Sequence, residues 1–283
     1  MATTKRGPLT ISHLDEGAGP PALLLHSGGL SSRQWLRLAS RLKSFRRVLA
    51  PDLLGYGTST PWPADAPFDL DEDLRLIEAL IEGVRGPFDV VGHSYGGLMA
   101  LRFALKHPRE VRSLAVYEPV AFGVLYEPPD PDGAADLAAL DHDGKFLADE
   151  GGGSEAWLER FVDYWNGPGA WKTVSDATRA AFLRSGRKVF QEVRSVMTDR
   201  TPVSAYRVVE APVLLLDGAE STRAAHRVCD RLASAFPNAR RITFPETGHM
   251  GPLTNATAVN RAILDHIDRE GAWQIPPAHD LRR

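Results

Sequence analysis

The chain has 283 residues, of which 43% are hydrophobic and 24% are charged, and its formal net charge is −3. This length suits one large α/β domain with an insertion, or two small domains, and the small net charge gives no indication of nucleic acid or an anionic membrane as a partner. The single cysteine, Cys229, excludes an internal disulfide framework, and no window approaches the ~20 apolar residues of a membrane span, so we expect a cytoplasmic protein without a membrane partner.

The first segments predict two kinds of strand. Residues 9–14 alternate in polarity, which is typical of a strand with one solvated face. Residues 21–26 are almost continuously apolar, as expected of a strand buried on both faces in a parallel sheet. A turn containing Gly28 and Gly29 follows, and then apolar residues at helical spacing.

Residues 48–50 form a short predicted strand, and the loop after them contains Asp52, Gly55 and Gly57. The two glycines do not form a dinucleotide-binding motif, because no third glycine follows and two prolines prevent a helix there. We interpret Asp52 as a structural carboxylate that accepts hydrogen bonds from backbone N–H groups of its loop. The acidic run at 69–73 precedes an amphipathic pattern, so it indicates a helix start and not a metal site.

The strongest motif lies at residues 88–97, where an apolar run ends at Gly92 and a helical pattern begins after Gly96. The order strand, tight turn, helix around a G-x-S-x-G sequence is typical of a serine nucleophile, here Ser94. Glycines are needed on both sides because a strained turn leaves no room for side chains. Serine alone is a weak nucleophile, so the motif predicts a histidine base and a third group elsewhere in the chain.

Attack by Ser94 on a carbonyl would create an oxyanion, which needs hydrogen-bond donors. We assign this hole to the backbone N–H groups of Gly28 and of Tyr95, which begins the predicted helix; an ordinary tight turn at Gly28 is the alternative. The expected base is His249, in a glycine-flanked loop after the predicted strand 241–244. The other histidines show no i,i+4 pair on a helix, so no metal site is indicated.

Residues 123–199 lack the alternation of strands and helices found on either side. The segment opens with prolines and continues with helical patterns, and half of the six tryptophans lie in it, namely Trp157, Trp165 and Trp171. An aromatic helical insertion between two strands indicates a lid over a mostly apolar pocket; the alternative is that these aromatics only pack the insertion onto the core. The predicted organisation is a core of residues 1–122 and 200–283 and a lid of residues 123–199.

Over nearly its whole length the chain resembles the α/β-hydrolase superfamily. The matching segments are the turn at 26–29, the loop at 51–57, the motif at 92–97, the helical insertion and the loop at 248–250. The resemblance implies an eight-stranded, mostly parallel sheet flanked by helices, with Ser94 as nucleophile and His249 as base. It also implies that the N–H groups of Gly28 and Tyr95 bind the oxyanion.

Two positions depart from the family pattern. Ser27 stands where members usually have glycine in the first turn. Ser221 stands where members usually carry the aspartate that orients the histidine, a few residues after the strand at 213–216. The third member of the triad must therefore come from another carboxylate.

Three carboxylates compete for this role: Glu118, Glu220 and Asp217. Some superfamily members, such as a subset of haloalkane dehalogenases, supply the acid from the strand after the nucleophile helix, and Glu118 lies at the C-terminal end of that strand here (residues 114–117). Glu220 lies one residue away from the usual position, and Asp217 lies inside a strand end. We favour Glu118.

The predicted activity is that of a carboxylesterase or lactonase acting on a small to medium, largely apolar substrate through a Ser-His-Glu triad and an acyl-enzyme. A serine nucleophile argues against epoxide hydrolase and haloalkane dehalogenase chemistry, which use aspartate there by family pattern. Carbon–carbon bond hydrolysis, cofactor-free perhydrolysis and hydroxynitrile lysis stay open on the same triad, and a ligand-sensing protein with little turnover is the alternative of another class. We expect a small-molecule substrate, no cofactor, no metal, and a monomer or homodimer.

Overall fold

The computed structural model describes residues 1–63 and 66–269; residues 270–283, which the sequence assigns to the core, lie outside the described residues. The described chain forms one eight-stranded sheet in the order β1-β2-β4-β3-β5-β6-β7-β8. All neighbours from β4 to β8 pair in parallel, and β2 pairs antiparallel with β1 and β4. The strands are β1 (Ala2–Arg6), β2 (Leu9–Glu16), β3 (Pro21–Leu25), β4 (Arg47–Pro51), β5 (Phe88–His93), β6 (Val111–Tyr117), β7 (Val213–Gly218) and β8 (Ala239–Phe244).

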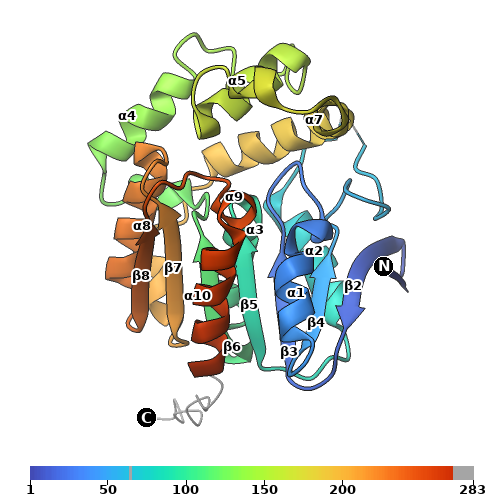
Figure 1. The fold of residues 1–283 in the computed structure, drawn as a ribbon. Coiled ribbons are helices and arrows are strands. Elements are labelled where there is room, and N and C mark those ends of the chain that lie inside the picture. The colour runs from blue at the N-terminus through green and yellow to red at the C-terminus, as the bar shows by residue number, and fades with distance from the viewer. Residues whose placement is uncertain (64–65, 270–283) are drawn as a thin grey trace, which may run out of the picture.

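Helices cover both faces of this sheet (Figure 1). Helices α1 and α10 pack on one face, and α2, α3 and α8 pack on the other. The helices are α1 (Leu36–Leu42), α2 (Leu70–Ile81), α3 (Tyr95–Lys106), α4 (Pro131–Leu140), α5 (Glu155–Asn166), α6 (Ala170–Thr173), α7 (Asp176–Thr198), α8 (Arg223–Ala235), α9 (Gly251–Thr254) and α10 (Ala256–Arg269), with 3-10 turns at Ser32–Trp35, Pro108–Glu110, Phe122–Leu125 and Val203–Val208. Within the described residues, no helix has the length and apolar character needed to cross a membrane. The predicted fold class, a mostly parallel eight-stranded sheet flanked by helices, is confirmed.

Burial explains why the central strands have such apolar sequences. β3, β5, β6 and β7 are buried along their whole lengths because helices cover both of their faces. The acidic run begins α2 as predicted: the Asp69 carboxylate accepts a hydrogen bond from the Asp71 N–H (2.8 Å) and caps the helix. These strands and helices form the layers that carry the loops described below.

The N-terminal edge differs from the sequence prediction. The polar residues 2–6 form β1, a strand that the sequence does not indicate because it has no apolar alternation. The predicted solvated face of β2 is wrong: Ile11 to Leu14 are all buried, because α2 contacts this strand and the loop after β4 hydrogen-bonds along it. Asp52 does accept a backbone hydrogen bond, but from Ser32 (2.8 Å) in the neighbouring turn and not from its own loop.

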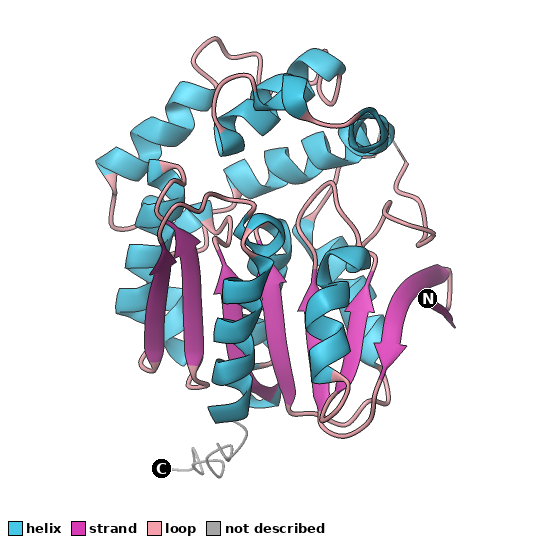
Figure 2. Cartoon of the chain, in the orientation of Figure 1, coloured by secondary structure: helices cyan, strands magenta, loops and turns pink. Residues whose placement is uncertain are grey.

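Between β6 and β7 the chain forms a helical segment with no strand in it, apart from one isolated bridge between Tyr126 and Pro129. Figure 2 shows these helices together beyond the carboxyl ends of the parallel strands. The long helix α7 runs across those strand ends, above the loops that follow β3, β4 and β5 (Figure 1). Boundaries at residues 123 and 199 stay a prediction.

Candidate active site

Ser94 lies on the sharp turn that joins β5 to α3. Its backbone has φ 53° and ψ −117°, a conformation that costs on the order of 1–3 kcal/mol for a residue with a side chain. Glycines flank it for reasons of space: a Cβ on Gly92 would collide with the Gly96 carbonyl group, and a Cβ on Gly96 would collide with the carbonyl oxygen of Leu25. This turn lets Ser94 line an apolar cavity of about 310 Å³.

His249 and Glu118 lie beside this serine. His249 Nε2 is 2.9 Å from Ser94 Oγ, and His249 Nδ1 is 2.7 Å from Glu118 Oε2. Because an ionised carboxylate can only accept, Nδ1 carries the proton and Nε2 is left to accept from the serine hydroxyl. The exposed fractions of Ser94, His249 and Glu118 are 7%, 3% and 1%, so these hydrogen bonds lie in a low-dielectric setting that strengthens them.

The three competing carboxylates have different surroundings. Glu118 adopts φ 42° directly after β6, which turns its side chain toward His249. The Glu220 side chain is exposed to solvent. Asp217 is buried, but its oxygens pair with Arg241 (2.6 Å) and His226 (2.8 Å). Of the three, Glu118 is the carboxylate that contacts His249.

Two further groups hold the Glu118 carboxylate. Gly218 donates its backbone N–H to Glu118 Oε1 (2.8 Å), and the Ser221 hydroxyl donates to Oε2 (2.6 Å). Ser221 is one of the two residues that depart from the family pattern. In this chain the position usually filled by an aspartate instead supplies a hydrogen-bond donor to the glutamate one strand away.

His93, next to the serine, is a supporting residue that the sequence reasoning missed. His93 Nε2 donates to the carbonyl oxygen of His249 (2.9 Å), and its Nδ1 lies 3.0 Å from Gln34 Nε2. Gln34 Oε1 accepts a hydrogen bond from the Ser27 N–H (3.0 Å). Ser27, which stands where the family usually has glycine, is therefore linked to His93 through the Gln34 side chain. Burial lowers the pKa of His93 well below its usual value, which keeps the ring neutral in this role.

Trp165 covers the imidazole of His249. The two rings stack with centroids 3.8 Å apart and an interplanar angle of 20°. In the same loop, the Gly248 carbonyl oxygen accepts a hydrogen bond from the Tyr117 hydroxyl (2.7 Å). The sequence placed Trp165 among the aromatics of the helical segment, but its contact with His249 is a tertiary one that no local pattern signals.

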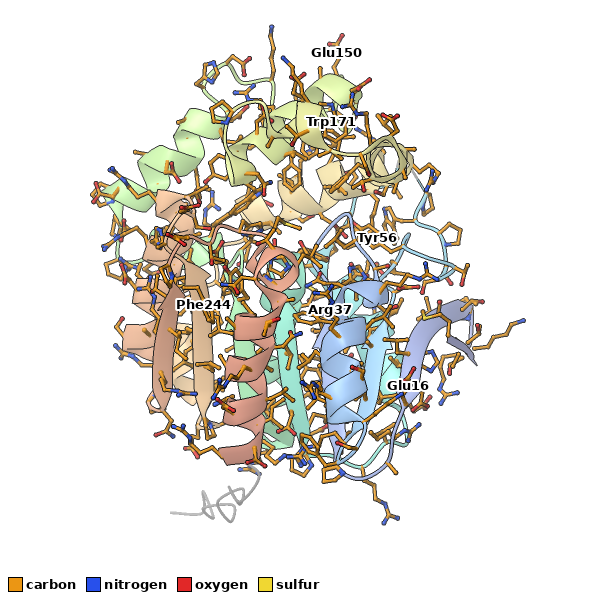
Figure 3. All side chains as sticks on the ribbon, viewed as in Figure 1. Glu16, Arg37, Tyr56, Glu150, Trp171 and Phe244 are labelled. Atoms are coloured by element: carbon orange, nitrogen blue, oxygen red, sulfur yellow. The ribbon has the colours of Figure 1, made fainter. Side chains whose placement is uncertain are left out.

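Gly28 and Tyr95, the expected oxyanion donors, both line the cavity with Ser94. A Cβ built on Gly28 would lie 3.6 Å from Tyr95 Cβ and 3.1 Å from Glu192 Oε2. The turn after β3 and the start of α3 are therefore adjacent, and the carboxylate of Glu192 from α7 lies against them. Figure 3 shows Tyr56, a partner of Glu192, at the level where the core faces the helical segment.

The cavity has a volume of about 310 Å³ and is lined mainly by apolar side chains, many of them from α5 and α7. Among its described lining residues, Glu192 is the only Asp or Glu and none is Lys or Arg. Burial raises the pKa of Glu192 to about 7, while the neighbouring Lys188 ammonium opposes that rise. Within residues 1–63 and 66–269, no group of three or more His, Cys, Asp or Glu side chains is placed to hold a metal ion.

The chain is similar in sequence and in fold to known hydrolases. A family model described as the alpha/beta hydrolase family matches residues 22–262. The chain is 28% identical over 260 residues to the pimeloyl acyl-carrier-protein methyl ester esterase of Chromobacterium violaceum, covering 90% of this chain and 96% of that protein. It is 28% identical over 269 residues to a 2-hydroxymuconate semialdehyde hydrolase of Pseudomonas putida, covering 89% of each. Among solved structures, a thermophilic esterase from Thermogutta terrifontis matches with a TM-score of 0.71 at 21% identity, covering 95% of this chain and 97% of that one.

Proposed function

The chain belongs to the alpha/beta hydrolase family and is a hydrolase, and from that premise we propose that it cleaves carboxylic esters or lactones through a triad of Ser94, His249 and Glu118. The observation that carries this proposal is the pair of hydrogen bonds from His249 to Ser94 Oγ (2.9 Å) and to Glu118 (2.7 Å). A nucleophile bonded to a base that is itself oriented by a third group is the arrangement that activates a serine.

The reaction proceeds in two halves. His249 Nε2 takes the Ser94 proton as Oγ attacks the carbonyl carbon, and the N–H groups of Gly28 and Tyr95 stabilise the oxyanion. The C–O bond to the alcohol then breaks, and His249 gives its proton to the leaving oxygen. Water, deprotonated by His249, attacks the acyl-enzyme. The bond between the acyl carbon and Ser94 Oγ then breaks, His249 returns the proton to Oγ, and the acid leaves. Glu118 stays ionised and stabilises the imidazolium in each half.

The substrate we propose is small and uncharged. A cavity of about 310 Å³ with mainly apolar lining favours a short acyl chain. With Glu192 in the lining and no Lys or Arg among the described lining residues, an anionic substrate would find a carboxylate and no counter-ion. We also propose residues 123–199 as a lid, because side chains of α5 and α7 form much of the cavity lining.

The test is hydrolysis of p-nitrophenyl butyrate by the wild type, by Ser94→Ala and by Ser234→Ala, an exposed serine, as the matched control. We expect turnover and labelling by an organophosphonate for the wild type and Ser234→Ala, and loss of both for Ser94→Ala. Labelling at another residue, or activity in Ser94→Ala, would contradict the triad. For the substrate class, mono-p-nitrophenyl succinate should show kcat/KM at least about tenfold below the butyrate, because the described lining offers no Lys or Arg to offset the desolvation of its carboxylate.

A second candidate is hydrolysis of a carbon–carbon bond, which the likeness to a 2-hydroxymuconate semialdehyde hydrolase favours. A substrate of that name carries a carboxylate, and the described cavity lining offers it no cationic side chain. The semialdehyde assayed beside p-nitrophenyl butyrate separates the two. A higher kcat/KM for the semialdehyde would replace the ester proposal with this one.

A further inference from the structure

A chain of hydrogen bonds runs from the turn after β3 to helix α7. The Gly29 N–H, next to the proposed donor Gly28, donates to the Tyr56 hydroxyl oxygen (3.0 Å). The Tyr56 hydroxyl donates in turn to Glu192 Oε2 (2.7 Å). Through Tyr56, a side chain of α7 holds the backbone of the oxyanion turn.

A second chain runs from α7 to the start of α3. Lys188 Nζ donates to Glu192 Oε1 (2.7 Å) and to Asp73 Oδ2 (3.2 Å). The hydroxyl of Tyr95, whose backbone N–H is the other proposed donor, donates to the same Asp73 oxygen (2.8 Å). The two chains meet at the Lys188–Glu192 pair, one turn apart on α7. We call Tyr56, Asp73, Tyr95, Lys188 and Glu192 the Lys188 cluster.

The Lys188 cluster is buried and its groups depend on one another. Its five residues are between 0% and 7% exposed, and the Lys188 ammonium also lies 3.8 Å from the centre of the Phe68 ring. One ammonium is shared by two carboxylates, so removing Lys188 would leave both without their cation. Burial raises the pKa of both tyrosines well above the usual value, which keeps the two hydroxyls protonated as donors.

We propose that Lys188 and Glu192 are positioning residues that fix the backbone N–H groups of Gly28 and Tyr95 at the geometry of the oxyanion hole. This rests on the proposed function. The hole is complete only when α7 is seated, because α7 supplies the pair that joins the two donor segments. Oxyanion donors act through precise placement, and a shift of ~1 Å in a reacting group can cost ~10²-fold in rate.

The experiment compares Tyr56→Phe, Glu192→Gln and Lys188→Met with Arg227→Met as a matched control. Arg227 pairs with Asp130 (2.6 Å) and so also joins the helical segment to the core, but neither residue lines the cavity. The readouts are kcat and KM for p-nitrophenyl butyrate and the Ki of butylboronic acid, which forms a tetrahedral adduct on a catalytic serine. Tyr56→Phe is the mildest change, since it removes one hydroxyl, and it decides the question if Lys188→Met does not fold.

Removal of a whole oxyanion donor costs ~10²–10³-fold in kcat. Tyr56→Phe and Glu192→Gln leave the donors in the chain but hold them less firmly, so we expect kcat to fall about tenfold in each. KM should stay within about twofold of the wild-type value, and the boronate Ki should rise in proportion to the loss in kcat. The reason is that the N–H groups of Gly28 and Tyr95 stabilise the oxyanion in the tetrahedral state more than they stabilise the bound substrate. A variant that combines Tyr56→Phe with Glu192→Gln should lose no more kcat than the more damaged single variant, since both changes break the same chain of hydrogen bonds.

Values of kcat and Ki equal to those of Arg227→Met, or a rise in KM alone, would overturn the proposal. If Ser94→Ala is inactive and Tyr56→Phe has the kcat and Ki of Arg227→Met, the positioning role is wrong and the proposed function stands. Active Ser94→Ala would overturn both.

Discussion

Two buried charged clusters lie at opposite ends of the sheet. The Asp89 cluster (Arg46, Asp89 and Arg112) sits at the amino end of β5, where both guanidinium groups donate to Asp89 at 2.6–2.9 Å. The Lys188 cluster sits beyond the carboxyl ends of the strands, next to the turn that carries Ser94. The first joins strands within the core, and the second joins the core to α7. The same kind of interaction therefore supports the scaffold at one end and the candidate site at the other.

The largest effect on stability should come from the Asp89 cluster. Asp89→Asn leaves two nearly buried arginines without their carboxylate, and breaking a buried ion pair costs about 3–5 kcal/mol. Since the cluster is far from the cavity, kcat of the folded protein should change by no more than about twofold. Urea unfolding and initial rates measure the two quantities. A loss of kcat larger than the loss shown by Tyr56→Phe would remove the contrast between the clusters.

The pH dependence of stability should reveal the Lys188 cluster. Glu192 is surrounded by Lys188, Asp73 and Tyr56. Burial raises the pKa of the Glu192 carboxyl from 4.5 to about 7. A raised pKa in the folded state favours folding below pH 4.5, and this contribution is lost as the pH rises to 7. At 1.36 kcal/mol per pKa unit the loss is about 3 kcal/mol. In urea unfolding at pH 4.5, 5.5 and 7.5, the free energy of unfolding should contain a decline with pH in the wild type that Glu192→Gln lacks. If the free energies of the two proteins change in parallel with pH, Glu192 does not have a raised pKa.

The smallest effect concerns the two tryptophans of the helical segment. Trp165 stacks on His249, whereas Trp171 packs on Phe182 away from it. Because an aromatic pair contributes about 0.5–1.5 kcal/mol, Trp165→Leu should lower kcat by up to about tenfold. The matched variant Trp171→Leu should lower the melting temperature and leave kcat close to the wild-type value. Equal losses of kcat in both would mean that the stacking has no role of its own.

Sequence reasoning located the parts of the candidate site that are local in the chain. Ser94 and its glycines form one turn, and the apolar runs elsewhere in the core segments indicate buried parallel strands. The acidic cap of α2 is likewise a local signal. Such features follow from residues a few positions apart, so the fold class and the site's position could be predicted.

The remaining parts depend on tertiary packing. Asp73 and Lys188 are 115 residues apart in sequence, and no local pattern shows that the Lys188 ammonium donates to the Asp73 carboxylate. Trp165 was recognisable as an aromatic of the helical segment but not as the ring that covers His249. The strand β1 was missed because its mostly polar residues lack the alternation of apolar and polar residues that marks a half-buried strand.

We propose that Glu118 takes the place of the usual aspartate as the partner of His249. The direct test is kcat for p-nitrophenyl butyrate in Glu118→Gln and Glu220→Gln, each with its unfolding curve measured. We predict a loss of up to ~10⁴ in Glu118→Gln, as loss of the triad acid can cause, and wild-type kcat in Glu220→Gln. A large loss of kcat in Glu220→Gln together with near-normal kcat in Glu118→Gln would show that Glu118 is not the acid of the triad.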